Sequence, residues 1–288
     1  MGLYLPVAVL AGLALLVAGL MRLGGWKGER TVKDGVATCV FGRKGAGKSL
    51  FMVHEALRCI GRPQRCKVCS FDKTSTVNSH RVHVAANFDL ILPEELRPYF
   101  IRLPSERDAM VHVLFREVEG RPGEYESGLP HLTLVLIDEM ALWFPARAGS
   151  MSLPKMFQGW VQMLRRFHHE LIYVAHDFSR VNKGVRDLTD EAAYLRKGLL
   201  GVRTVTTGDI SDVRKLEQWP RPKGFRPHEV YRFRITAAVT EAFNTHEIVM
   251  LTMPERRRER RVPAGGAGMD DGALIESGLL VPWADDEG

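Results

Sequence analysis

The first apolar stretch of the chain is its longest, and it carries no charge. Residues 3–20, LYLPVAVLAGLALLVAGL, contain no Asp, Glu, Lys or Arg. At about 1.5 Å per helical residue this stretch would span about 27 Å, close to the roughly 30 Å hydrocarbon core of a bilayer. A helix on the surface of a globular domain would show a polar stripe, which is missing here. The pattern predicts an uncleaved transmembrane helix, with a cleaved signal peptide as the alternative.

Positive charges follow this stretch at once, at Arg22, Lys27 and Arg30. Positive residues beside a membrane span mark its cytoplasmic side. We therefore expect the rest of the chain to lie in the cytoplasm, where ATP is available.

A second pattern, typical of a buried strand at residues 36–41, leads into a glycine-rich turn and a helical pattern. The turn, GRKGAGKS at residues 42–49, satisfies G-x-x-x-x-G-K-[ST] at every fixed position. Its glycines let backbone N–H groups converge on phosphates, and the start of the helix adds partial positive charge. We predict a P-loop in which Lys48 reaches the β- and γ-phosphates of ATP and Ser49 binds Mg²⁺. The predicted nucleotide-binding residues are Gly42, Arg43, Lys44, Gly45, Ala46, Gly47, Lys48, Ser49 and Leu50.

A third apolar run, residues 132–137, has the length and composition of a strand buried on both faces. Asp138 and Glu139 follow it, at the edge where parallel α/β sheets bind ligands. We predict that Asp138 supports Mg²⁺ and that Glu139 polarises an attacking water. A small-molecule kinase needs no water-activating glutamate, so the acidic pair favours ATP hydrolysis over phosphotransfer.

Together these patterns predict an α/β fold: a P-loop NTPase with a mostly parallel central sheet flanked by helices, preceded by a single N-terminal transmembrane helix. We expect a transmembrane anchor at 1–22, a linker at 23–34 and a P-loop ATPase domain at 35–255. A basic run and an acidic flexible tail would fill 256–288.

Three segments resemble the zonular occludens toxin N-terminal domain family, which includes the assembly ATPase of filamentous phages. LVLIDEMALWFPAR, residues 134–147, resembles the family's IDE motif and the aromatic segment that ends near F-P-x-R. Residues 160–188, WVQMLRRFHHELIYVAHDFSRVNKGVRDL, resemble the family block that begins near R-H-H and ends near R-D-L. Residues 81–90, RVHVAANFDL, resemble its strand that ends in an Asn.

The resemblance implies an additional-strand P-loop ATPase of the DNA-pumping and packaging group, working as a ring that drives phage extrusion at the inner membrane. Three departures stand out. The membrane span precedes the ATPase domain instead of following it, a long periplasmic carboxyl region is missing, and His176 stands where the family has Gln. The first two leave room for a genome-packaging ATPase of a membrane-containing phage.

Two further residues complete the predicted catalytic set of Glu139, Lys48, Arg166 and His176. The imidazole of His176 could replace the Gln amide as a sensor of the γ-phosphate, or it could be a hydrogen-bonded histidine at a strand end. In a ring, a neighbour's arginine could complete each site. Arg165 and Arg166 are the first candidates and Arg147 and Arg186 follow, with plain surface arginines as the alternative.

The net charge of +6 is unevenly distributed. Residues 262–288 hold six acidic and no basic residues, so the rest of the chain carries +12. This balance favours nucleic acid or an anionic membrane as a neighbour. The basic run could contact DNA or lipid phosphates, or it could be a solvated boundary. It consists of Arg256, Arg257, Arg258, Arg260 and Arg261.

Four cysteines are too few for a secreted disulfide scaffold of this length, which favours reduced thiols. Cys66 and Cys69 have the spacing of a zinc knuckle, but no second pair at matching spacing follows. Free thiols are therefore favoured over zinc, although further ligands could come from Cys59, His54, His80 and His83.

The sequence thus predicts an ATPase, with ATP and Mg²⁺ as cofactors, anchored in the inner membrane by a single span and working in the cytoplasm as a homo-oligomeric ring. Its cargo would be a phage virion or DNA, and it could itself be virion-associated. Phage assembly and extrusion is the first interpretation and DNA translocation during genome packaging the second. A non-hydrolytic nucleotide-binding scaffold is the third.

Overall fold

The computed structural model describes residues 30–66, 79–146, 155–198, 201–218 and 224–243. The predicted membrane span, the first part of the linker, the basic run and the acidic tail lie outside these residues. Within the described ranges no helix is both long and apolar enough to cross a membrane.

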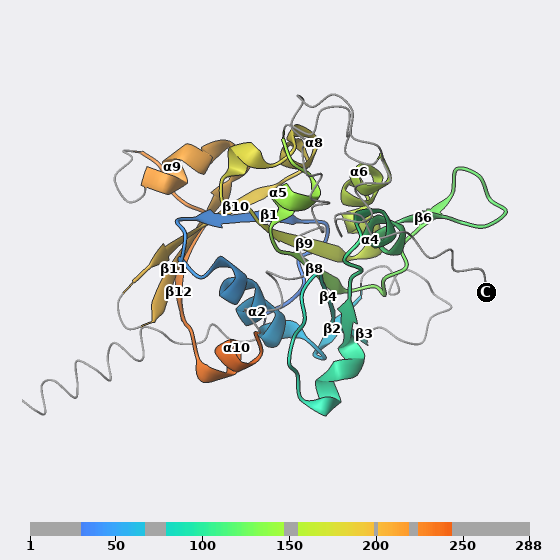
Figure 1. Ribbon diagram of the computed structural model, residues 1–288, viewed down its shortest axis with the longest axis horizontal. Helices are drawn as coiled ribbons and strands as arrows, with labels where there is room; N and C mark the ends of the chain where they lie inside the picture. Colours follow the sequence, from blue (N-terminus) through green and yellow to red (C-terminus); the bar gives the residue numbers. More distant parts are fainter. Residues whose placement is uncertain (1–29, 67–78, 147–154, 199–200, 219–223, 244–288) are drawn as a thin grey trace, which may run out of the picture. The chain divides into compact units, whose positions relative to one another are not determined.

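An eight-stranded sheet forms the centre of the described domain (Figure 1), in the order β12-β11-β10-β1-β9-β8-β4-β5. The six strands from β10 to β5 run parallel, and β11 and β12 extend the sheet as an antiparallel pair. The strands are β1 (Ala37–Gly42), β4 (His83–Ala86), β5 (Phe100–Arg102), β8 (Thr133–Ile137), β9 (His169–Val174), β10 (Glu191–Lys197), β11 (Val202–Asp209) and β12 (Glu229–Arg234). The predicted mostly parallel α/β sheet is confirmed.

Helices cover both faces of this sheet (Figure 1). The first face carries α2 (Lys48–Cys59), α10 (Ala237–Glu241) and the 3-10 helix η1 (Glu94–Tyr99). The second face carries α4 (Arg107–Leu114), α5 (Met140–Trp143), α6 (Lys155–Gln162), α7 (Leu164–Phe167) and α8 (Lys183–Asp187). Helix α9 (Val213–Gln218) packs on β10 and β11. The remaining elements are η2 (Phe178–Arg180), η3 (Ile210–Asp212) and the two-stranded sheets of β2 (Pro63–Arg65) with β3 (Ser79–Arg81) and β6 (Arg116–Glu117) with β7 (Tyr125–Glu126).

The alternation of side chains along β8 shows why both faces need helices. Leu134 and Leu136 pack into the core under α2, whereas Val135 and Ile137 pack into the core under α4 to α7. All four are fully buried, because successive side chains of a strand point to opposite faces. The continuous apolar run that predicted a doubly covered strand is explained by this arrangement.

The order of the strands places the predicted motifs at one edge. Strand β9 lies between β1, which leads into the P-loop, and β8, which leads into Asp138. This is the additional strand that the family resemblance implied. Since β1, β9 and β8 are parallel, their carboxyl ends meet at the edge where such sheets bind ligands.

Local structure differs from the prediction around α4. The sequence pattern predicts a helix from about Glu106 to Val118 and, because residues 121–130 are rich in Gly, Pro and Glu, a surface loop from Arg121 to Pro130. In the structure α4 ends at Leu114. Phe115 is extended, at φ −158°, and its ring stacks on Tyr125 with the centroids 4.8 Å apart. This contact lies beside the short β6–β7 pair, which takes the place of the predicted helix end and of part of the predicted loop.

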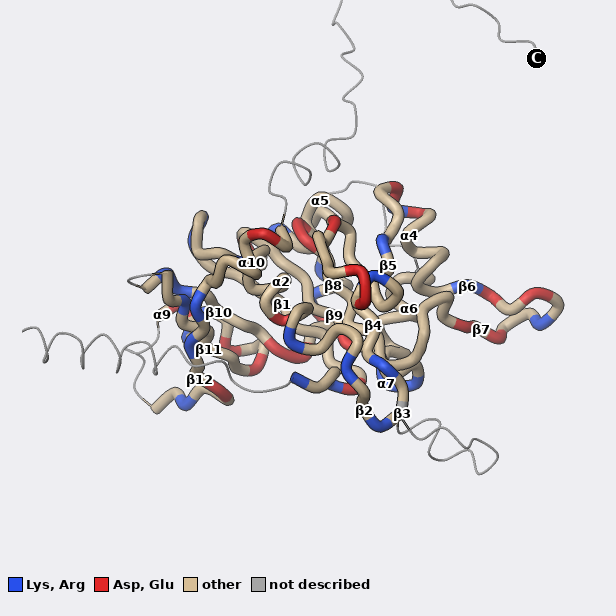
Figure 2. Tube along the Cα trace, turned by 90° about the horizontal axis from the view of Figure 1, so that it is seen from below, with Lys and Arg blue, Asp and Glu red and all other residues tan. Residues whose placement is uncertain are grey.

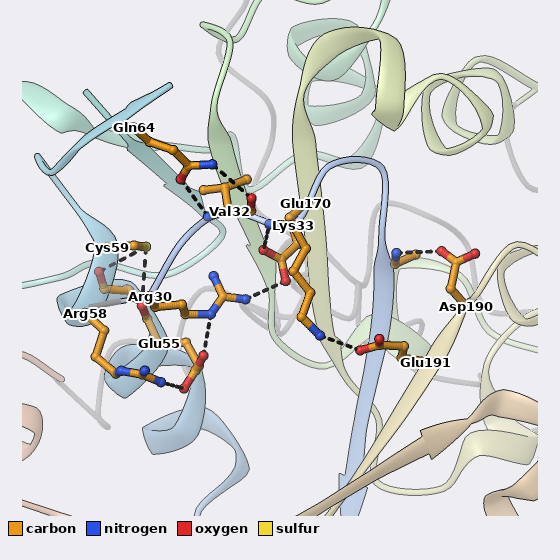
Figure 3. A network of polar contacts seen from close by, with 12 residues as sticks. Arg30, Val32, Lys33, Glu55, Arg58, Cys59, Gln64, Glu170, Asp190 and Glu191 are labelled. Carbon is orange, nitrogen blue, oxygen red and sulfur yellow. Dashed lines mark hydrogen bonds and ion pairs between the residues drawn. The ribbon is translucent and has the colours of Figure 1, made fainter. Parts of the chain in front are cut away.

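Buried charges tie the start of the described chain to the sheet and to α2 (Figure 3). The guanidinium of Arg30 contacts Glu55 of α2 and Glu170 of β9, and Glu55 also accepts a hydrogen bond of 3.1 Å from Arg58. Glu170 accepts a further bond, 2.8 Å, from the backbone N–H of Lys33. Residues 30–33, part of the predicted linker, are therefore packed into the domain.

Candidate functional site

The P-loop is built by a left-handed backbone that only glycine adopts without strain. Gly47 has φ 89° and stands immediately before α2, and Gly42 has φ 147° at the end of β1. A Cβ atom on Gly42 would lie 2.6 Å from the carbonyl oxygen of Leu195 on β10, so a larger residue would also clash there. The chain therefore turns tightly from β1 into the first turn of α2, where backbone N–H groups point at an incoming anion.

Lys48 lies in this loop with carbonyl oxygens as its hydrogen-bond partners. The residue is 5% exposed, and its Nζ donates to the carbonyl oxygens of Gly42, at 3.1 Å, and Arg43, at 3.5 Å. Burial lowers the pKa of Lys48, although Glu139 and Asp138 oppose this shift. No carboxylate among the described residues forms an ion pair with this ammonium. A phosphate group would supply the missing counter-charge, so the predicted role of Lys48 fits the site.

Ser49 and Asp138 meet directly although 89 positions separate them. The Ser49 hydroxyl donates a hydrogen bond of 2.7 Å to Oδ2 of Asp138, which is 2% exposed. Burial raises the pKa of Asp138 to about 6, against the bonds from Ser49 and from the Glu139 N–H. A hydroxyl and a carboxylate are hard oxygen ligands, the kind Mg²⁺ takes together with water and substrate phosphates. The two predicted metal ligands are thus placed side by side.

Asn87, which follows β4, holds the backbone of Asp138 from both sides. Its Nδ2 donates to the Asp138 carbonyl oxygen at 3.0 Å, and its Oδ1 accepts from the Asp138 N–H at 2.8 Å. The residue is buried at 6% exposure. The sequence pattern pointed to a strand ending in Asn, but it assigned this residue no role at the site. Its role here is to fix the end of β8 that carries both acidic residues.

Glu139 combines an unusual backbone with a side-chain partner. It has φ 54° and ψ 48°, a left-handed conformation that is uncommon for a residue with a Cβ. Its Oε1 lies 2.6 Å from Nε2 of His176, which follows β9. Backbone strain of this kind persists where the surrounding structure holds it, often at functional sites. The structure therefore brings two predicted catalytic residues, Glu139 and His176, into contact.

Two of the four candidate arginines lie away from the P-loop edge. Arg165 and Arg166 are exposed on α7, which precedes β9 and so lies at the strand's amino end, opposite the P-loop. Consistent with this, Arg165 packs against Gly35, just before β1. Arg186 lies on α8, with its guanidinium 5.7 Å from the ring of Phe178, and Arg147 is outside the described residues. Arg166 is thus not part of this chain's own P-loop edge, and its predicted action on a neighbouring subunit stays a prediction.

A cavity of about 880 Å³ opens beside the P-loop. Residues 43–46 form one wall, residues 194–197 at the end of β10 form another, and Glu217 and Gln218 close it. The guanidinium of Arg196 lies 5.3 Å over the ring of Tyr194 and donates to the carbonyl oxygen of Glu217 at 2.8 Å. Lys and Arg positions occur on β10, β11 and α9, the elements on this side of the P-loop (Figure 2). The sequence patterns did not point to this cavity, because its walls come from three distant segments.

The zinc hypothesis finds no cluster to support it in the part of the chain that the structure describes. The Cys59 thiol donates to backbone carbonyls of α2, and burial raises its pKa to about 12, so it is a poor source of thiolate. The ring of His54 stacks on Phe233, with centroids 4.7 Å apart. Cys66 is buried, with its sulfur 3.9 Å from Nδ1 of His131, and Cys69 falls outside the described ranges.

Part of the chain matches a known protein family. Residues 124–217 match the family model of the zonular occludens toxin (Zot), so the predicted resemblance is confirmed over this segment. The matched segment contains Asp138, Glu139 and His176 but not the P-loop. No curated protein matches the chain.

Two solved structures are similar to the described fold. The N-terminal domain of zonular occludens toxin from Neisseria meningitidis is 14% identical, with a TM-score of 0.43, and the match covers 73% of this chain and 99% of that one. The genome packaging NTPase B204 from Sulfolobus turreted icosahedral virus 2, solved in complex with ATP-gammaS, is 11% identical, with a TM-score of 0.34, and the match covers 62% of this chain and 94% of that one.

Proposed function

We propose that this protein is a membrane-anchored P-loop ATPase that hydrolyses ATP with Mg²⁺ and drives phage assembly and extrusion at the bacterial inner membrane. The observation that carries the proposal is the 2.7 Å hydrogen bond between Ser49 and Asp138. It joins the P-loop to the carboxylate strand at the edge where Lys48 and Glu139 also lie, so four residue types needed for hydrolysis share one place.

Each of these residues has a distinct task. Lys48 and the loop N–H groups bind the phosphates. Ser49 and Asp138 would hold Mg²⁺, which would supply positive charge to neutralise the phosphate oxygens. Glu139 accepts a proton from the attacking water. The water oxygen bonds to the γ-phosphorus while the bond between the γ-phosphorus and the bridging β-phosphate oxygen breaks. His176 contacts Glu139 and fixes the direction of its carboxylate.

The cavity beside residues 43–46 is the place for the ribose and base in this proposal. Its volume of about 880 Å³ lies within the usual range of ligand sites. The guanidinium of Arg196, which lies over the ring of the buried Tyr194, offers a planar surface on which a purine can stack.

The anchor, the ring and the cargo rest on sequence. The uncharged stretch at residues 3–20 and the positive residues after it support a single span with the ATPase domain in the cytoplasm. The resemblance to the Zot family, matched at residues 124–217, implies a role in phage assembly. The homo-oligomeric ring is proposed because the same resemblance implies it. DNA translocation during genome packaging is the second candidate, favoured by the position of the uncharged stretch ahead of the P-loop. The basic run at 256–261 would then contact DNA, or anionic lipid in either case.

Hydrolysis is tested with the full chain purified in detergent. Glu139→Gln should lower the turnover of ATP by about 100-fold or more while ATP affinity stays within a few-fold, since a lost general base affects chemistry and not binding. Lys48→Ala should abolish binding itself. The control is Glu119→Gln, an exposed acid in the β6–β7 turn. A wild-type protein that binds ATP without turnover would favour the third interpretation, a nucleotide-binding scaffold.

A further inference from the structure

Arg203 of β11 lies against the P-loop although it belongs to no part of the G-x-x-x-x-G-K-[ST] pattern. A Cβ atom on Gly47 would lie 3.1 Å from Nε of Arg203 and 3.6 Å from Cδ1 of Ile235. The side chain of Arg203 therefore runs past the point where the loop enters α2.

The antiparallel extension of the sheet brings Arg203 to this edge. Strand β11 pairs with β10 so that Arg203 lies opposite Lys197, at the carboxyl end of β10. That end is level with the end of β1, where Gly42 lies opposite Leu195. Arg203 and Val205 point to the same face, the one covered by α2, because side chains two positions apart share a face of a strand.

The guanidinium of Arg203 is buried without a counter-charge. The residue is 8% exposed, its Nη1 donates to the carbonyl oxygen of Val202 at 3.2 Å, and its Nε has no hydrogen-bond partner among the described residues. No ion pair joins it to a carboxylate within the described ranges. Arg58, the other buried arginine of the described residues, differs because it contacts Glu55. The partly buried Arg30 contacts Glu55 and Glu170.

A buried cation without a counter-charge is costly, and an anion that arrives beside it offsets that cost. The P-loop at Gly47 is where the phosphates of a nucleotide would arrive. We propose that Arg203 is a phosphate-binding residue of this chain's own site, donating from its guanidinium to the phosphate chain of a nucleoside di- or triphosphate held in the P-loop. This inference rests on the proposed function, because it requires that the P-loop binds nucleotide.

The test compares three variants of the full chain in detergent, with ADP and ATP-gammaS as the probes. Arg203→Met keeps the length of the side chain and removes its charge and donors. Arg203→Lys keeps the charge but loses the planar fork of donors. The matched control is Arg232→Met. Arg232 is an exposed residue of β12 that lies opposite Thr204, so its side chain points to the face of the sheet opposite to that of Arg203.

We expect Arg203→Met to weaken the binding of both probes by about 10- to 100-fold, the usual effect of losing a hydrogen bond to a charged group. Arg203→Lys should fall between Arg203→Met and the wild type, and Arg232→Met should bind as the wild type does. Without nucleotide, Arg203→Met should unfold at the same temperature as the wild type or higher, because an unpaired buried charge has been removed.

Two results would overturn the inference. One is an Arg203→Met protein that binds both probes as tightly as the wild type. The other is a protein that unfolds at a lower temperature without nucleotide yet shows the full rise in unfolding temperature when nucleotide is added, since that marks a packing role. A wild-type protein that binds neither probe would instead refute the proposed function, so the two failures are distinguishable.

Discussion

Nε2 of His176, just beyond the end of β9, lies 2.6 Å from Oε1 of Glu139, just beyond the end of β8. A carboxylate that accepts a proton from water must be oriented toward that water, and a misplacement of about 1 Å can lower the rate about 100-fold.

The first prediction follows from this contact. His176→Ala should lower the turnover of ATP by about 10- to 100-fold, because Glu139 loses its positioning partner. His176→Gln should lose much less, since the Gln amide can also donate to a carboxylate. Steady-state turnover of the full chain measures both, and His112→Ala, on the exposed side of α4, is the control. Equal losses in His176→Ala and His176→Gln would contradict the positioning role.

The second prediction concerns Asn87. Asn87→Ala should lower the free energy of unfolding by about 2–4 kcal/mol, because it leaves both the N–H and the carbonyl of Asp138 buried without partners. Asn182→Ala is the comparison: it removes one cap bond, to the N–H of Gly184, and should cost about 1 kcal/mol. Urea unfolding measures both values. A loss of unfolding free energy at Asn87 no larger than the loss at Asn182 would show that the two hydrogen bonds from Asn87 do not fix the end of β8.

The third prediction concerns pH. Burial lowers the pKa of His169 from 6.5 to about 4, and the neighbouring His131 and His168 act in the same direction. The neutral ring accepts from Trp160 at Nδ1 and donates to the carbonyl oxygen of Pro130 at Nε2. The pKa of His169 is lower in the folded protein than in the unfolded one. The neutral ring therefore stabilises the folded protein fully above pH 6.5, and this stabilisation is lost as the pH falls toward 4. The free energy of unfolding that His169 contributes in this way is about 3 kcal/mol.

His169→Gln isolates this effect. Its amide can accept and donate without titrating, so its unfolding free energy should depend less on pH between 6.5 and 4 than that of the wild type. The quantity to compare is the difference in unfolding free energy between the variant and the wild type at each pH. In both proteins the raised pKa of Asp138 stabilises the fold as the pH falls, which opposes the effect of His169. His112→Asn, at an exposed position, should leave the wild-type dependence intact. Parallel curves for His169→Gln and the wild type would refute the assignment.

The fourth prediction concerns Arg30. Arg30→Ala should lower the free energy of unfolding by about 3–5 kcal/mol, because it leaves the buried carboxylates of Glu55 and Glu170 without their shared cation. Lys33→Ala is the matched control, since Lys33 forms a more exposed pair with Glu191 and should cost less than about 1 kcal/mol. Denaturant unfolding gives both values, and similar losses would mean that the buried network adds nothing beyond a surface ion pair.

The parts of the site that could be predicted from sequence are those carried by short patterns. The spacing in GRKGAGKS placed Lys48 and Ser49, and a charge-free strand ending in two acids placed Asp138 and Glu139. The parallel sheet then brings these two segments together, because parallel strands end at one edge.

The missed residues depend on pairing between distant strands. Asn87 reaches Asp138 only because β4 lies beside β8 in a register that puts Ala86 opposite Leu136. Arg203 reaches Gly47 only because β11 runs antiparallel to β10. No local pattern specifies such registers, since they follow from the packing of whole faces. The predicted membrane span and the cargo stay predictions.

The buried network at Arg30 has a mechanical consequence. In the proposed anchored protein, the chain leaving the membrane reaches Arg30 and is fastened there to α2 and to β9. Helix α2 begins at the P-loop, and β9 leads to His176. A force between the membrane and the domain would therefore act on the two elements that carry the proposed phosphate-binding loop and the partner of the proposed catalytic Glu139, and no flexible linker would absorb it at Arg30.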